Sequence, residues 1–130
     1  MKTQWLNKWF VLALIWFGAS IYTLFFSSGN QSVSIPHFDK ICHFGLFFGQ
    51  FWLLCKICLQ SNSTLPIRQY LILALLWAAI SEVIQSQLPH RSGDILDAIA
   101  DLLGAICALW LAKKIQFARR SMSQGIQHES

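Results

Sequence analysis

The strongest constraint on this chain is a set of four apolar segments, each long enough to cross a lipid bilayer. A helix needs roughly 20 residues to cross a hydrocarbon core of about 30 Å. Only helices and closed barrels can pair all of their backbone hydrogen-bonding groups in lipid. Long apolar runs therefore predict an all-α membrane protein, which here is a four-helix transmembrane bundle in one domain. From residue 116 to 130 we expect a polar, frayed tail. The predicted spans are about 9–26, 41–59, 67–87 and 94–114.

Composition supports this class and excludes others. Hydrophobic residues make up 55% of the chain and charged residues 12%, whereas a soluble domain carries about a quarter charged residues. The net charge of +4 does not indicate nucleic acid, because the basic residues flank the apolar runs and suit the surface of a lipid bilayer. The first run exceeds the 7–15 apolar residues usual in a signal peptide, so we expect it to remain as a membrane helix.

The basic residues predict the orientation. With four spans, the N-terminus, the second loop and the C-terminus share one side, which carries eight of the ten Lys and Arg residues. Only Lys40 and Arg91 fall on the other side. The positive-inside rule therefore predicts a multi-pass protein with both termini in the cytoplasm.

The acidic residues are distributed the opposite way, since five of the six fall toward the outer side. Their spacings of three, four and seven residues place them on single helix faces together with several other polar groups. The polar set comprises Asp39, Lys40, His43, Glu82, Gln85, Arg91, Asp94, Asp97 and Asp101.

Two of these acids lie deep in their spans. Asp101 is twelve residues from Lys113, roughly 18 Å along the helix, and Glu82 is fourteen residues from Arg68, roughly 21 Å. A carboxylate facing lipid at such depth costs on the order of 3 kcal/mol. We therefore expect the second, third and fourth helices to converge around a polar cleft open to the outside. The alternative is an ion-pair network that only clamps the helices.

The polar set suggests a binding or catalytic site for a polar ligand at the outer face. Lys40 and Arg91 are suited to hold a phosphate, and His43 with Glu82 or Asp97 would form a general base with its orienting carboxylate. Whether a reaction is catalysed stays open. A divalent metal is a variant, in which carboxylates suit Mg²⁺, Mn²⁺ or Ca²⁺ and His43 completes a mixed site, although no recognised metal spacing is present. The candidate metal ligands are Glu82, Asp94, Asp97 and Asp101.

Besides a ligand site and a structural clamp, ion or proton transport is a third candidate function, since acids inside a membrane form relays. The acids stop in the outer half, which argues against a relay through the whole membrane. A pore made of such short bundles would also require a homo-oligomer. In the second segment, Gly45 and Gly49 form a pattern of small residues that predicts the close approach of another helix.

The ordered polar motifs resemble the VanZ-like family of small bacterial membrane proteins, named for a protein associated with teicoplanin resistance. The resemblance covers about residues 36–108 and implies a bacterial plasma-membrane protein, but it supplies no reaction. From the polar cleft we expect the protein to bind or modify a lipid headgroup or cell-wall precursor and to affect glycopeptide susceptibility. The family pattern has Asn where this chain has Asp101, which adds one acid here. The matching motifs are Asp39-Lys40-x-x-His43-Phe44, Glu82-x-x-Gln85, Pro89-x-Arg91-x-x-Asp94-x-x-Asp97 and Asp101-x-x-Gly104.

Overall fold

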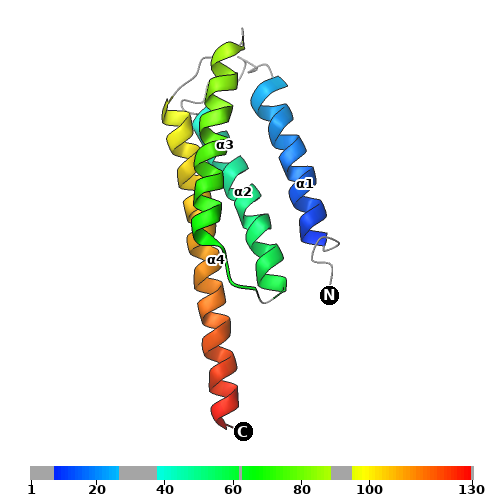
Figure 1. Cartoon of the computed structure of the whole chain (residues 1–130), viewed down its shortest axis with the longest axis vertical. Coiled ribbons are helices and arrows are strands. Elements are labelled where there is room, and N and C mark those ends of the chain that lie inside the picture. The colour runs from blue at the N-terminus through cyan, green and yellow to red at the C-terminus, as the bar shows by residue number, and fades with distance from the viewer. Residues whose placement is uncertain (1–7, 27–37, 62, 89–94, 130) are drawn as a thin grey trace.

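The computed structural model describes four helices that alternate in direction along the bundle (Figure 1). All four are long and apolar enough to cross a membrane, which confirms the predicted fold. Within the described residues, 8–26, 38–61, 63–88 and 95–129, there is no strand. The elements are α1 (Lys8–Ile21), which continues into the π-helix η2 (Tyr22–Phe26), α2 (Phe38–Gln60), α3 (Ile67–Gln87) and α4 (Ile95–Glu129).

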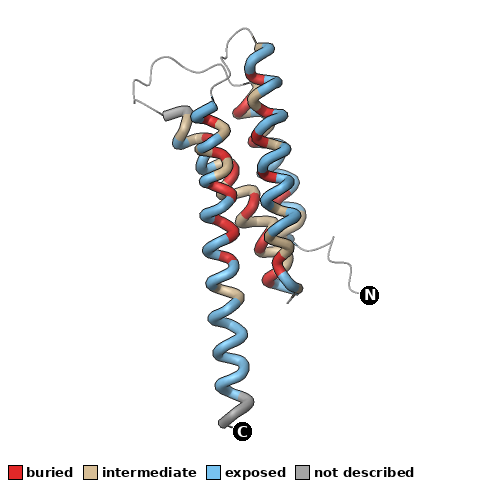
Figure 2. The backbone as a smooth tube through the Cα atoms, turned by 60° about the vertical axis from the view of Figure 1, so that its left-hand side comes forward, coloured by how far each residue is buried: buried red, intermediate tan, exposed pale blue. Residues whose placement is uncertain are grey.

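The fourth helix is longer than the sequence predicted. It continues to Glu129, so the expectation of a frayed tail from residue 116 is wrong. Two side chains tie its extension to the end of α2 and to the connection that follows it: the guanidinium of Arg119 donates to the Leu59 carbonyl at 3.4 Å, and the amide of Gln116 donates to the Ser63 carbonyl at 2.9 Å. Beyond these contacts the helix is exposed and separate from the bundle (Figure 2).

The centre of the bundle is the seam between α2 and α4. Every fourth residue of α2 faces this seam, and the side of α4 that packs against it consists mostly of small side chains. Small residues let two helix backbones approach closely, which is the main source of packing energy in a membrane. The buried stripe of α2 is His43, Phe47, Phe51, Cys55 and Leu59, and that of α4 is Asp101, Gly104, Ala105, Ala108 and Ala112.

The first helix is fastened to α2 by a tryptophan. The indole Nε1 of Trp16 donates to the carbonyl of Leu46 at 2.9 Å, and its ring lies against Gly49. A side chain on Gly45, by contrast, would meet no heavy atom within 4 Å of its Cβ. Of the two glycines expected to admit another helix, Gly49 therefore admits an aromatic ring of α1, while Gly45 has no close neighbour.

A belt of lysines and tryptophans surrounds one end of the bundle, where α1 begins and α2 ends. The Lys56 ammonium lies 5.4 Å from the ring centre of Trp9 and 4.9 Å from that of Trp52. On α4, Lys114 lies 4.3 Å from the ring centre of Trp110. Such pairs are typical of a membrane–water boundary, so this end of the bundle lies at one surface of the bilayer.

Candidate functional site

The core of the site is a buried pair between α2 and α4 at the opposite end of the bundle, hereafter the site end. The Nδ1–H of His43 donates to Oδ1 of Asp101 at 2.7 Å, and the two residues are 2% and 0% exposed. A hydrogen bond to a carboxylate at this length is strong and directional. Asp101 therefore fixes the tautomer and the orientation of the imidazole.

This pairing corrects a prediction. The sequence led us to expect Glu82 or Asp97 as the carboxylate that orients His43, but Asp101 occupies that position. The reason lies one turn along α4, where Gly104 rests on the backbone of α2. A Cβ on Gly104 would lie 3.0 Å from the Phe48 nitrogen and 3.1 Å from the Phe44 carbonyl carbon. Glycine thus brings the helices close enough for Asp101 to reach His43.

On its other side, the imidazole faces a second carboxylate of α4. The Nε2 of His43 lies 3.7 Å from Oδ2 of Asp97, too far for a hydrogen bond, and this nitrogen is buried without a hydrogen-bond partner among the described residues. The other oxygen of Asp97 lies 3.4 Å from the Lys40 ammonium, which is about a quarter exposed. Among the described residues, Lys40 therefore connects Asp97 to the surface.

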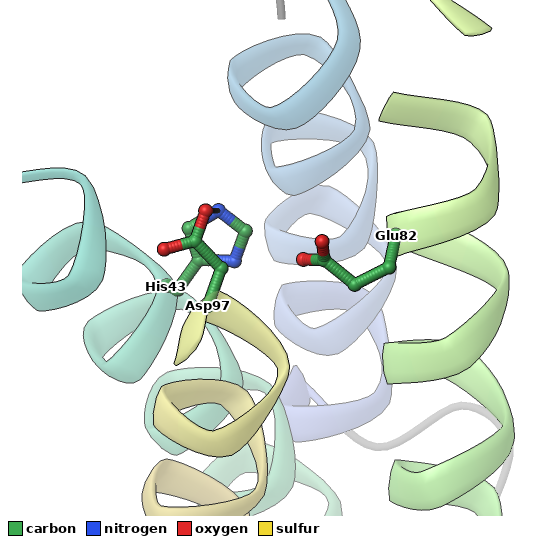
Figure 3. A group of neighbouring side chains, drawn as sticks. All are labelled: His43, Glu82 and Asp97. Atoms are coloured by element: carbon green, nitrogen blue, oxygen red, sulfur yellow. Dashed lines mark ion pairs between the residues drawn. The ribbon is translucent and has the colours of Figure 1, made fainter. Parts of the chain in front are cut away.

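The third helix contributes Glu82, whose side chain extends from α3 toward His43 and Asp97 (Figure 3). One ligand atom from each of these three residues lies within 4.8 Å of the other two. Two carboxylate oxygens and an imidazole nitrogen in this arrangement can hold a metal ion. Asp101 supports the imidazole from behind, as carboxylates commonly do for metal-bound histidines.

The predicted metal set therefore changes in part. Glu82 and Asp97 remain candidate ligands, and His43, which we expected to complete a mixed site, is grouped with them. Asp101 does not belong to the grouped ligand atoms, because its carboxylate lies on the Nδ1 side of the imidazole. Asp94 lies outside the described residues.

Gln85 is not directed at this cluster. Its Nε2 donates to the carbonyl of Leu24 in η2 at 3.0 Å, and the residue is 1% exposed. Because Gln85 lies one turn from Glu82 on α3, this bond holds the part of α3 that presents Glu82. The sequence did not predict that a carbonyl of η2 would accept this bond, because it carries no recognisable signal for a π-helix. Of the remaining predicted residues, Arg91 and the side chain of Asp39 lie outside the described part of the chain.

The side chains that the structure describes at the site carry an unbalanced formal charge. Among the described side chains at the site end, the carboxylates of Glu82, Asp97 and Asp101 are accompanied by the ammonium of Lys40 and the imidazole of His43. Three negative charges and one positive charge leave a formal charge of −2 when the imidazole is neutral. An excess of buried negative charge is costly and favours the binding of a cation.

Fold and site together define a multi-pass α-helical membrane protein with a buried histidine–carboxylate cluster near one end of its bundle. Comparison of the sequence with known families then gives its relationship. The chain belongs to the VanZ/LLP1 family, whose profile matches residues 2–118, and this confirms the resemblance seen in the motifs.

The chain is also similar to an uncharacterized protein of Schizosaccharomyces pombe. The two are 30% identical over 96 residues, which make up 72% of this chain and 56% of the relative. The chain thus spans little more than half the length of this curated relative. No solved structure shows a significant match.

Proposed function

We propose that this protein holds a divalent cation between His43, Glu82 and Asp97 and uses it to bind the anionic headgroup of a membrane lipid or cell-wall precursor. The observation that carries the proposal is the convergence of one ligand atom from each of these three residues within 4.8 Å of the other two. Nδ1 of the imidazole is already taken by Asp101 at 2.7 Å. Nε2 makes no hydrogen bond to a described residue and lies 3.7 Å from Oδ2 of Asp97, so Nε2 is the nitrogen left for an ion.

The charge of the site supports a cation. A divalent ion would offset the formal −2 of the described side chains and remove the cost of burying carboxylates in a medium of low dielectric. Carboxylates suit Mn²⁺ and Mg²⁺, and the imidazole favours Mn²⁺ over Mg²⁺ among these two. An ion with open coordination positions would then bind phosphate oxygens, and Lys40 would add a second positive charge next to Asp97.

The position of the site supports a ligand from the membrane. The cluster lies toward the end of the bundle away from the lysine and tryptophan belt, a few helical turns from the surface where lipid headgroups would meet the helices. The positive-inside rule assigns that belt to the cytoplasm, which would place the site on the outer face of a bacterial plasma membrane. A role in glycopeptide susceptibility would follow if the bound headgroup belongs to a cell-wall precursor.

The test is Mn²⁺ binding by the purified full chain in detergent, measured by electron paramagnetic resonance for the wild type and for His43→Ala, Glu82→Gln and Asp97→Asn. We expect one ion per chain and an affinity at least about tenfold lower in each variant. Glu129→Gln serves as the matched control, because it removes a carboxylate far along the chain from the site. An absence of Mn²⁺, Mg²⁺ and Zn²⁺ binding by the wild type would refute the metal site.

A structural clamp is the second candidate, and one observation favours it: the pairs His43–Asp101 and Lys40–Asp97 both join α2 to α4. Membrane abundance separates the two functions. If all three substitutions strongly lower the amount of protein in the membrane, the charges act as a clamp. If abundance stays normal while ion binding and any effect on teicoplanin susceptibility are lost, the cluster is a ligand site.

A further inference from the structure

Two lysines from different helices lie against one tryptophan ring, in the belt at the end of the bundle opposite the site. The Lys8 ammonium of α1 lies 5.2 Å from the ring centre of Trp9, and the Lys56 ammonium of α2 lies 5.4 Å from the same ring centre. Lys56 also lies 4.9 Å from the ring centre of Trp52, so two indoles hold it. Hereafter the paired-lysine cluster means Lys8, Trp9, Trp52 and Lys56.

The charge of this cluster has no described counter-ion. Neither lysine forms an ion pair with a described residue, and a third cation reaches the same end of α2. The guanidinium of Arg119 donates to the carbonyl of Leu59, which is three residues beyond Lys56. Like charges held this close repel one another, and an anion among them removes that cost. The described carboxylates all lie at the site end, on Glu82, Asp97 and Asp101.

The surroundings of the cluster suit a phospholipid. Tryptophan rings of this kind lie at the level of the headgroups, where the nearest anions are lipid phosphates. Leu12 and Ile15 follow Lys8 at steps of four and seven residues, so all three share one face of α1, and the two apolar side chains are 43% and 62% exposed. A lipid with its phosphate at Lys8 therefore has its hydrocarbon chain along apolar side chains, whereas free phosphate gains nothing from them.

We propose that the paired-lysine cluster binds the phosphate of an anionic phospholipid from the leaflet at the belt end of the bundle. Lysine stems are flexible, so both ammonium groups can turn from the shared ring toward one phosphate. A zwitterionic headgroup is disfavoured, because its own ammonium would meet the lysines. Since Lys8 belongs to α1 and Lys56 to α2, the bound lipid joins the first helix to the rest of the bundle. This lipid is separate from the ligand of the proposed function, and neither depends on the other.

The test is native mass spectrometry of the full chain in detergent, titrated with phosphatidylglycerol or with phosphatidylcholine of identical acyl chains. We expect the wild type to bind its first phosphatidylglycerol at least about tenfold more tightly than its first phosphatidylcholine. Lys8→Gln and Lys56→Gln should each reduce this preference about fivefold, whereas Lys56→Arg, which keeps the charge, should retain it.

Lys114→Gln is the matched control, because it removes the same charge at the same end of the bundle. Lys114 lies 4.3 Å from the ring centre of Trp110, a ring that no other described lysine shares. We expect this variant to keep the preference of the wild type. A loss as large as that of Lys56→Gln would mean that net charge sets the preference, and the proposed cluster would then be wrong.

Two further results would overturn the proposal. One is equal affinity of the wild type for the two lipids, and the other is release of phosphatidylglycerol by millimolar inorganic phosphate, which would make this a site for a soluble anion. Thermal unfolding of the wild type in nanodiscs tests the proposal even if a variant does not accumulate. The chain should unfold at a higher temperature in phosphatidylglycerol than in phosphatidylcholine, and equal temperatures would contradict a lipid that joins α1 to α2.

Discussion

The contact between Gly104 and the backbone of α2 allows a sharp prediction. A Cβ at this position would collide with the Phe44 carbonyl oxygen and would lie 3.0 Å from the Phe48 nitrogen and 3.1 Å from the Phe44 carbonyl carbon. Non-bonded heavy atoms pack at about 3.5–4.0 Å, so Gly104→Ala must move α4 away from α2 by about 1 Å or more. None of these atoms can yield alone, because all of them belong to the backbone of a helix.

The same movement weakens the central pair of the site. The His43–Asp101 distance of 2.7 Å would increase to about 3.7 Å or more, which is beyond the limit of a hydrogen bond. Overpacking costs about 1–3 kcal/mol, and loss of a buried hydrogen bond to a charged group costs about 1.5–3 kcal/mol. Since alanine recovers about 1 kcal/mol of helix propensity, we expect a net loss of roughly 2–5 kcal/mol.

Equilibrium unfolding in mixed micelles measures this loss. The matched control is Gly45→Ala, on α2, where a Cβ meets no heavy atom within 4 Å. We expect the control to unfold like the wild type, and Gly104→Ala to unfold at markedly milder conditions with weaker Mn²⁺ binding. Equal stability of the two alanine variants would refute the view that close approach at Gly104 builds the site.

Three further substitutions test individual contacts. Asp101→Asn keeps an acceptor for His43 but removes its charge, so Mn²⁺ affinity should fall about tenfold with the fold intact; an unchanged affinity would argue against a supporting role for this carboxylate. Trp16→Phe removes the bond to the Leu46 carbonyl and should cost about 1 kcal/mol in unfolding experiments, whereas no cost would mean that α1 is held by other contacts. Gln85→Leu leaves a carbonyl of η2 without its donor and should cost about 1–3 kcal/mol, while unchanged stability with weaker headgroup binding would make Gln85 a ligand residue.

The four spans could be predicted because the bilayer imposes a minimum length on every apolar helix. The end of α4 could not, since the end of an apolar run marks the membrane boundary and not the end of a helix. The Gln116 and Arg119 side chains secure the first turns of the extension by bonds to carbonyls of the α2–α3 connection and of the last turn of α2. The acceptor carbonyls are distant in sequence from Gln116 and Arg119, so no local sequence pattern predicts these bonds.

Intramembrane charge identified the residues of the site, but their partners depended on how the helices pack. Spacing within α4 places Asp97 and Asp101 on one face, yet it does not tell which of them is level with His43. That register is set by Gly104 against α2. Likewise, Gln85 shares a face with Glu82, but a carbonyl of η2 draws its amide toward α1.

The distribution of the site over α2, α3 and α4 has a consequence for biogenesis. The two carboxylates of α4 leave the ribosome last, after the helix that carries His43 and Lys40 has already been made. Their partners on α2 are thus available when α4 enters the bilayer, and the histidine–carboxylate pair can form as the helix arrives. Assembly of the last helix and completion of the cluster are then the same event, and a chain interrupted before α4 would retain α2 and α3 without the carboxylates that complete the cluster.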